Sequence, residues 1–124
     1  MATSLAAQAI NPLVAVPSIV KYEKRPPLMQ VDPKEFAREL LAPADFKCFN
    51  NLMSKESAWQ DKKNPTSSAE GVGQLLDSTV ENLGLKRGKS RVSQTVAALS
   101  YIGRKYGSGG ACKAWAFFQQ HNYY

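Results

Sequence analysis

The sequence predicts a mainly α-helical fold. Apolar residues recur at helical spacing in several segments, and no segment of convincing length alternates as a β-strand would. The chain has 124 residues, which leaves room for one small domain with a single core. Its composition, 44% hydrophobic and 21% charged, is that of a folded protein. We therefore expect one helical domain with a modest free energy of unfolding.

Residues 1–44 are predicted to form an N-terminal arm that ends in a short helix. The paired prolines 26–27 favour an extended path in its first part. Asp32, Pro33 and Glu35 then supply a helix cap, a proline at the first helical position and a carboxylate in the first turn. The start of the chain lacks the positively charged region of a secretory signal, so we expect no cleaved targeting peptide. Because the arm carries apolar residues, we expect it to dock against its own domain or a partner.

Four more helices are predicted within residues 45–124. They cover residues 46–59, 79–83, 91–106 and 111–119, and the second and third end at Gly84 and Gly107. Their apolar faces are expected to form the core: Phe46, Phe49, Leu52, Met53 and Trp59; Val92, Val96, Leu99, Ile102 and Tyr106; Ala111, Trp115 and Phe118.

Glu56 is the first candidate for chemistry. It follows Phe49, Leu52 and Met53 by seven, four and three positions, so it lies beside an apolar stripe of the predicted helix. An apolar neighbourhood penalises the charged form of a carboxyl group and keeps it protonated near neutral pH, as the cleavage of a glycosidic bond requires. On spacing alone, such a residue is more often a boundary residue whose carboxylate reaches water.

An ordered series of short motifs carries a family resemblance, which favours the catalytic role for Glu56 over the boundary role. The series is Glu56-Ser57-Ala58-Trp59, then residues 64–74 (NPTSSAEGVGQ), 98–102 (ALSYI), 104–107 (RKYG) and 114–115 (AW). It resembles the soluble lytic transglycosylase domain of goose-type lysozyme fold, most of all the versions found in phage tail and virion proteins. The resemblance covers about residues 45–124 and implies a small lysozyme-like domain there, with residues 1–44 outside it.

The resemblance implies a reaction for Glu56. In that family, this glutamate protonates the oxygen between N-acetylmuramic acid and N-acetylglucosamine, and then acts as a base while the muramoyl 6-hydroxyl closes a 1,6-anhydro ring. One carboxylate suffices, and no cofactor is implied. Asp61, Glu70 and Asp77 lie close enough in sequence to keep a two-carboxylate hydrolase open as an alternative.

Further site residues are implied by the same motifs. Gly71-Val72-Gly73-Gln74 corresponds to the family's Gly-Leu-Met-Gln motif, which lines the cleft around the acid. Here Gly73 replaces a bulkier residue, and Glu70 stands where the phage versions often have Tyr. We therefore expect the floor of the substrate-binding cleft to differ from that of the family. The alternative is a tight turn that binds nothing.

Ser57 is expected to orient the acid or contact sugar. Tyr101 matches a family tyrosine whose hydroxyl reaches toward the catalytic centre, although a buried ring with a satisfied hydroxyl would explain it equally well. Four aromatic residues offer flat faces for sugar stacking: Trp59, Trp115, Tyr123 and Tyr124. For Trp115, a place in the core is the better expectation.

The two cysteines, Cys48 and Cys112, fall near positions where the phage-type relatives often carry cysteines. The resemblance implies a disulfide, which would close a long loop and stabilise a small domain outside the cell; the alternative is two buried thiols. The sole histidine, His121, is expected to lie in solvent, so neither a metal site nor a cysteine nucleophile is predicted.

A formal net charge of +6 favours an anionic partner. Charge alone does not choose among nucleic acid, acidic lipid and the bacterial wall, but the basic residues are spread through the chain, whereas a nucleic-acid-binding protein needs a coherent positive face. No apolar run approaches the ~20 residues of a membrane span. The resemblance implies a phage virion or tail enzyme that cleaves peptidoglycan in the periplasm or wall during genome entry, and the basic charge suits an anionic wall. Its residues 1–44 would contact other virion or tail proteins. The alternatives are a non-catalytic virion structural or wall-binding protein and a packaged DNA-binding protein.

Overall fold

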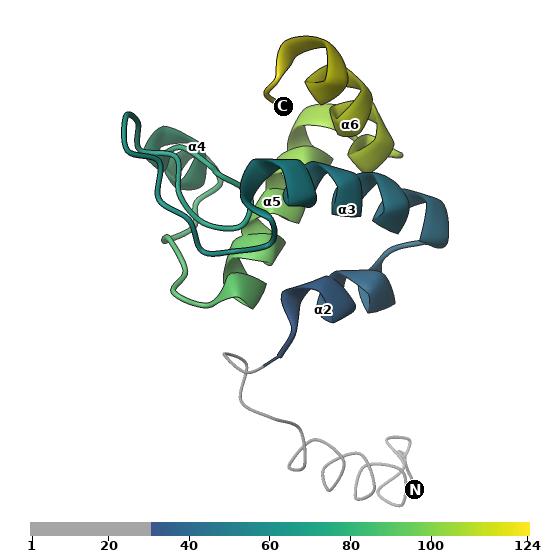
Figure 1. Cartoon of the computed structure of the whole chain (residues 1–124), viewed down its shortest axis with the longest axis horizontal. Coiled ribbons are helices and arrows are strands. Elements are labelled where there is room, and N and C mark those ends of the chain that lie inside the picture. Colours follow the sequence, from purple (N-terminus) through teal and green to yellow (C-terminus); the bar gives the residue numbers. More distant parts are fainter. Residues whose placement is uncertain (1–30) are drawn as a thin grey trace, which may run out of the picture.

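The computed structural model describes residues 31–124, which form five helices (Figure 1). They are α2 (Pro33–Leu40), α3 (Pro43–Ser57), α4 (Asp77–Asn82), α5 (Arg91–Tyr106) and α6 (Gly110–His121). Within residues 31–124 the only β-type pairings are isolated bridges that join Glu70 to Lys63 and Leu75. The prediction of a mainly α-helical fold is therefore confirmed. The extended path predicted for the first part of the arm lies outside the described residues.

The helix ends follow local chemistry. In α2, the Asp32 side chain accepts a hydrogen bond from the Lys34 amide at 3.0 Å, and Pro33 takes the first position, as the sequence predicts. Helix α5 begins directly after Ser90, whose side-chain oxygen accepts a hydrogen bond from the Ser93 amide. Helix α3 begins three residues before Phe46 and ends two before Trp59, because Ala58 and Trp59 adopt left-handed conformations.

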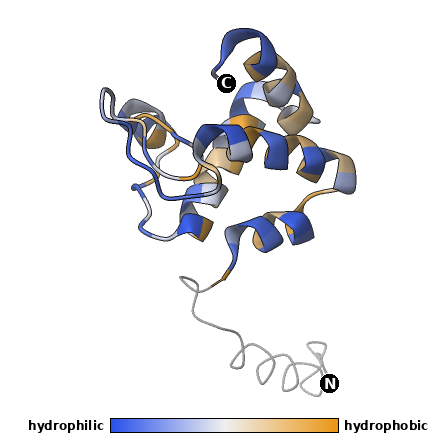
Figure 2. Cartoon of the chain, in the orientation of Figure 1, coloured by the Kyte–Doolittle hydropathy of each residue, from blue (hydrophilic) through white to orange (hydrophobic). Residues whose placement is uncertain are grey.

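The core forms where α3 and α5 both pack against α6, while α2 lies against α3 and α5 (Figure 1). Its centre is the apolar stripe of α3, in which Phe49, Leu52 and Met53 are fully buried. Helix α2 contributes the buried Ala37, so this part of the chain packs on the same core. Figure 2 shows that the helices mix hydrophobic and hydrophilic residues along their length, as amphipathic helices around one core do.

The buried face of α5 differs from the predicted one. Val92 and Ile102 are buried as expected, but Val96 is 41% exposed and the fully buried Thr95 takes its place. Thr95 tolerates burial because its hydroxyl donates to the Arg91 carbonyl at 2.8 Å. A search for apolar periodicity passes over such a residue, which explains why the predicted face was rotated.

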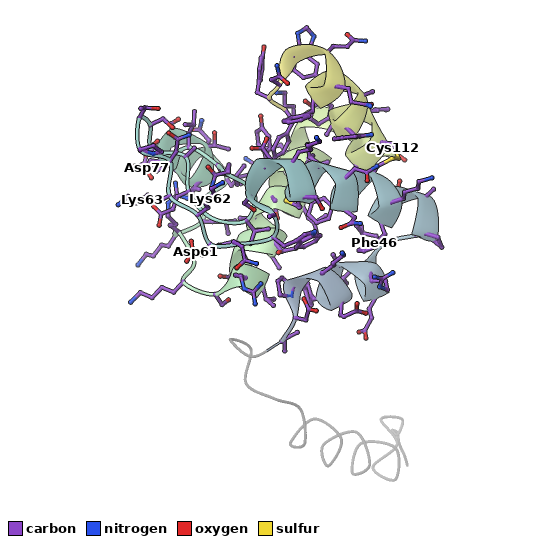
Figure 3. All side chains as sticks on the ribbon, in the orientation of Figure 1. Phe46, Asp61, Lys62, Lys63, Asp77 and Cys112 are labelled. Carbon is purple, nitrogen blue, oxygen red and sulfur yellow. A yellow bond between two sulfur atoms is a disulfide. The ribbon has the colours of Figure 1, made fainter. Side chains whose placement is uncertain are left out.

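Cys48 of α3 and Cys112 of α6 are joined in a disulfide, 64 positions apart in sequence (Figure 3). The bond links the helix that carries Glu56 to the last helix. Among residues 31–124, no helix has both the length and the apolar character that a membrane crossing requires.

Candidate active site

Glu56 lines a cavity of about 360 Å³ at the end of α3. The glutamate is half-buried and lies in the last turn of its helix. The other walls come from four places: the loop of residues 58–76 that follows α3, Thr79 of α4, Tyr101 of α5 and the tail of residues 122–124. Elements far apart in sequence thus enclose one carboxyl group.

Glu56 is the only acidic side chain among the described residues that lines this cavity. Asp61 is exposed, and Figure 3 shows Asp61 and Asp77 on the side of the molecule where the 58–76 loop lies. Glu70 and Asp77 both face Arg87, with N–O distances of 3.8 and 2.7 Å. Asp61, Glu70 and Asp77, the candidates for a second catalytic carboxylate, therefore do not line the cavity.

Burial raises the pKa of the Glu56 carboxyl group from 4.5 to about 7, because desolvation penalises the charged form. Its place at the C-terminal end of α3 acts in the same direction, since the partial negative charge there disfavours a second negative charge. A carboxyl group that is close to half-protonated at neutral pH can donate a proton and later take one back.

This raised pKa predicts a pH-dependent stability difference. Between about pH 4.5 and 7 the folded protein binds the Glu56 proton while the unfolded chain has released it, so the free energy of unfolding falls as the pH rises through this window. The Glu56→Gln variant lacks this dependence. We expect its Tm to exceed that of the wild type by more at about pH 8 than at about pH 4. Thermal unfolding followed by circular dichroism at the two pH values checks this, and an equal Tm difference at both would contradict it.

The 58–76 loop is fixed beside the acid by two buried side chains that bond to Val72. Ser57 donates to the Val72 carbonyl at 2.6 Å, and the Val72 amide donates to the side-chain oxygen of Gln94 at 3.0 Å. Ser57, expected to orient the acid or contact sugar, is 3% exposed and does not line the cavity. In this structure its hydroxyl anchors the loop beside Glu56. Gln94 was not singled out from the sequence, since a polar residue on a helix gives no such signal.

Gln74 lines the cavity and closes the loop at the same time. Its side-chain nitrogen donates to the carbonyls of Lys62 and Gly71, at 2.7 and 2.8 Å. With both amide protons donated to the main chain, Oε1 is the atom left to accept a hydrogen bond from a ligand. Gly71, Val72 and Gly73, predicted to bind substrate, are buried and do not line this cavity. Gly71 instead accepts one of the hydrogen bonds that position Gln74.

Arg87 holds the far side of the loop, a role that the sequence alone does not indicate. Its guanidinium donates to the carbonyls of Ser68, Glu70 and Leu75 and to the carboxylate of Asp77. Arginine has five N–H donors in a fixed plane, which suits this set of acceptors. The contacts span residues 68–77 and could not be paired from the sequence.

Gly73, the second glycine of the 71–74 segment, lies directly beside Tyr124. The Tyr124 hydroxyl donates to the Gly73 carbonyl at 2.7 Å. A Cβ atom at Gly73 would stand 2.9 Å from that hydroxyl oxygen and 2.8 Å from the Cβ of Ala98. The second glycine of the motif is therefore matched to the tyrosine that packs against it.

The Gly73→Ala variant is expected to lose about 1–3 kcal/mol of unfolding free energy, because the added methyl group overpacks a filled site. The matched control is Gly103→Ala in α5, where a Cβ meets nothing within 4 Å. That change should stabilise the protein by up to about 1 kcal/mol, since alanine is the better helix former. Urea unfolding of both variants checks this, and equal stabilities would contradict it.

Tyr101 is brought to the cavity wall and its hydroxyl is already engaged. It donates to the main-chain oxygen of Tyr124 at 2.9 Å and accepts from the Lys105 ammonium at 3.1 Å. The two tyrosine rings meet edge to face, with centroids 5.4 Å apart. Tyr101 therefore holds the tail in place as one wall of the cavity, and its ring faces the space where a ligand would lie.

The aromatic residues considered for sugar stacking differ in whether a ring face is accessible. Trp59 is 6% exposed, packs edge-on against Phe49 and donates to Asn50 at 2.9 Å, so its faces are closed to sugar. Trp115 stacks on Phe118 against the core. Tyr123 lines the cavity and is 57% exposed, which leaves it as the ring available for stacking.

Residues 31–124 contain no cluster of three or more side chains of the types that bind metals, and His121 is exposed. The chain matches no protein-family model, no curated protein and no solved structure.

Proposed function

We propose that the protein cleaves peptidoglycan as a lytic transglycosylase, at the β-1,4 bond between N-acetylmuramic acid and N-acetylglucosamine. One observation carries the proposal. Among residues 31–124, Glu56, with its pKa raised to about 7, is the single acidic side chain that lines a cavity of about 360 Å³. The lysozyme-like resemblance of residues 45–124 supports the same function and is part of the proposal.

Glu56 performs both proton transfers. As an acid it protonates the glycosidic oxygen, and the bond from that oxygen to the muramoyl anomeric carbon breaks. As a carboxylate it then takes the proton of the muramoyl 6-hydroxyl, whose oxygen attacks the same carbon and closes the 1,6-anhydro ring. The proton given in the first step is recovered in the second, so Glu56 returns to its starting state and no water is consumed.

The cavity favours this route over hydrolysis with two carboxylates. An inverting enzyme needs a second carboxylate roughly 6.5–9.5 Å from the first, and a retaining enzyme needs one at roughly 5 Å. Asp61, Glu70 and Asp77 are turned to solvent or to Arg87. A nucleophile that belongs to the substrate removes the need for a second carboxylate.

The proposal includes a place of action. The net charge of +6 suits an anionic wall, and the resemblance to phage tail and virion domains suggests a virion enzyme that opens the wall during genome entry. Residues 1–44 would then contact other virion or tail proteins. The open cavity favours an enzyme over a non-catalytic virion module, in which the cavity could be filled.

Digestion of purified sacculi tests the proposal. The soluble products should be muropeptides with 1,6-anhydro ends, which mass spectrometry distinguishes from reducing ends by the missing water. Reducing ends would replace transglycosylation by hydrolysis. No soluble product from the folded protein, with or without residues 1–30 and across several wall types, would overturn the proposal in favour of a structural or wall-binding role.

A further inference from the structure

A second cavity of about 180 Å³ adjoins the one that contains Glu56. Thr79 of α4 and Tyr101 of α5 line both, so the two cavities are neighbours that these two residues separate. Arg104 and Lys105 form part of the wall of the second cavity, which Asn82 and Leu83 complete. A ligand in the first cavity could therefore extend into the second without leaving the surface of the protein.

The second cavity is positively charged. No carboxylate lines it, and the ion pairs among the described residues involve only Arg38 and Arg87. The Arg104 guanidinium donates to the Asn82 carbonyl at 2.8 Å, a contact that fixes its direction and uses only part of its donors. The Lys105 ammonium bonds to the Tyr101 hydroxyl and lies 5.3–5.4 Å from three aromatic rings. Two positive charges thus stand at the cavity, and no acidic side chain in the described part of the chain pairs with either of them.

Cations in the last turn of a helix also stabilise it through the helix dipole, and Arg104 and Lys105 occupy the last turn of α5. That effect needs no cavity and no ligand. It does not account for a wall shared with the Glu56 cavity, or for an arginine held by a neutral carbonyl in place of a carboxylate. The two explanations predict different behaviour toward substrates with and without anionic groups.

We propose that this second cavity is an anion subsite that binds the carboxylates of the peptide stem attached to the muramoyl sugar. The inference rests on the proposed function. The peptide stem leaves the lactyl group of the same sugar whose bond is cleaved, so a stem that follows the protein surface from the Glu56 cavity can bring a carboxylate to the neighbouring cavity. Arg104 provides the planar pair of donors that suits a carboxylate, and Lys105 adds a point charge.

Kinetics on two forms of one glycan test the subsite. The substrates are glycan chains that carry their peptide stems and the same chains stripped by an amidase. We expect the wild type to prefer the peptide-bearing form, measured as a ratio of kcat/KM. The Arg104→Gln variant should lower this ratio about tenfold, the scale of a hydrogen bond to a charged group, with kcat/KM on stripped glycan unchanged. Arg104→Lys should keep part of the preference.

Lys47→Gln is the control for loss of charge, because Lys47 is exposed on α3 and lines neither cavity. It should leave the ratio unchanged. If Arg104→Gln leaves the ratio unchanged, either because it slows both substrates equally or because it slows neither, the proposed anion subsite is wrong and the cleavage reaction still stands. Thermal unfolding of each variant separates these results from misfolding.

If the wild type cleaves neither glycan, the proposed function fails, and binding then decides the subsite. Titration of the labelled protein with a free stem tetrapeptide, followed by NMR, should shift the signals of Thr79, Tyr101 and Arg104. The shifts of the Thr79 and Tyr101 signals should be absent in the Arg104→Gln variant. Shifts with glycerol phosphate but not with the peptide would assign the cavity to the phosphates of wall polymers and overturn the peptide assignment, as would no shift with either.

Discussion

The Glu56→Gln variant is expected to release glycan fragments from peptidoglycan about a thousandfold more slowly than the wild type, within the range for loss of a general acid and base. Glutamine keeps the shape of the side chain but can neither give a proton to the glycosidic oxygen nor take one from the 6-hydroxyl. The release of soluble muropeptides from sacculi over time measures the effect. Because glutamine carries no charge to desolvate, the variant should remain folded.

Asp61→Asn is the matched control for this prediction. Asp61 was the nearest alternative carboxylate in sequence, and it is exposed and does not line the Glu56 cavity. Its removal should leave the rate of release within about twofold of the wild type, as expected for a surface carboxylate outside the reaction. A large loss in Asp61→Asn, or near-normal release by Glu56→Gln, would show that the chemistry lies elsewhere.

Removal of the Cys48–Cys112 disulfide should give the largest loss of stability. The bond closes a loop of 64 positions, so its loss is expected to lower the free energy of unfolding by about 4 kcal/mol in the chain-entropy treatment. A small domain has only about 5–15 kcal/mol in total. The double variant Cys48→Ser, Cys112→Ser should therefore unfold at much lower urea concentration than the oxidised protein.

The reduced wild type provides the comparison for this variant. Treatment with a reductant should move its urea midpoint toward that of the double variant, and thiol titration verifies that both cysteines are free. A double variant within about 1 kcal/mol of the oxidised protein would show that packing alone holds α3 against α6.

The helices and the place of Glu56 could be predicted because their signals are local. Asp32 and Pro33 begin α2 through contacts within one turn, and Phe49 and Met53 define a buried stripe that fixes where Glu56 lies. The side of a helix follows from spacing alone once the helix is identified. This part of the site needed no knowledge of the other segments.

The rest of the site depends on contacts between segments that the sequence does not pair. The Val72 main chain meets Ser57 and Gln94 at separations of 15 and 22 positions, and Gly73 meets Tyr124 at 51. These contacts use serine, glutamine and glycine, residue types that are common in loops and on surfaces and give no periodic signal. The sequence indicates Gly73 as unusual, and the packing of Tyr124 and Ala98 against it explains why no side chain fits there.

The central claim is that the cavity beside Glu56 is where the glycan bond is cleaved. The structure of the Glu56→Gln variant with an oligosaccharide of alternating N-acetylglucosamine and N-acetylmuramic acid tests it most directly. We expect a muramoyl–glucosamine linkage whose glycosidic oxygen lies within hydrogen-bonding distance of the side chain at position 56, with a sugar ring against Tyr123. An oligosaccharide bound on another face, with no sugar in the cavity, would contradict the claim.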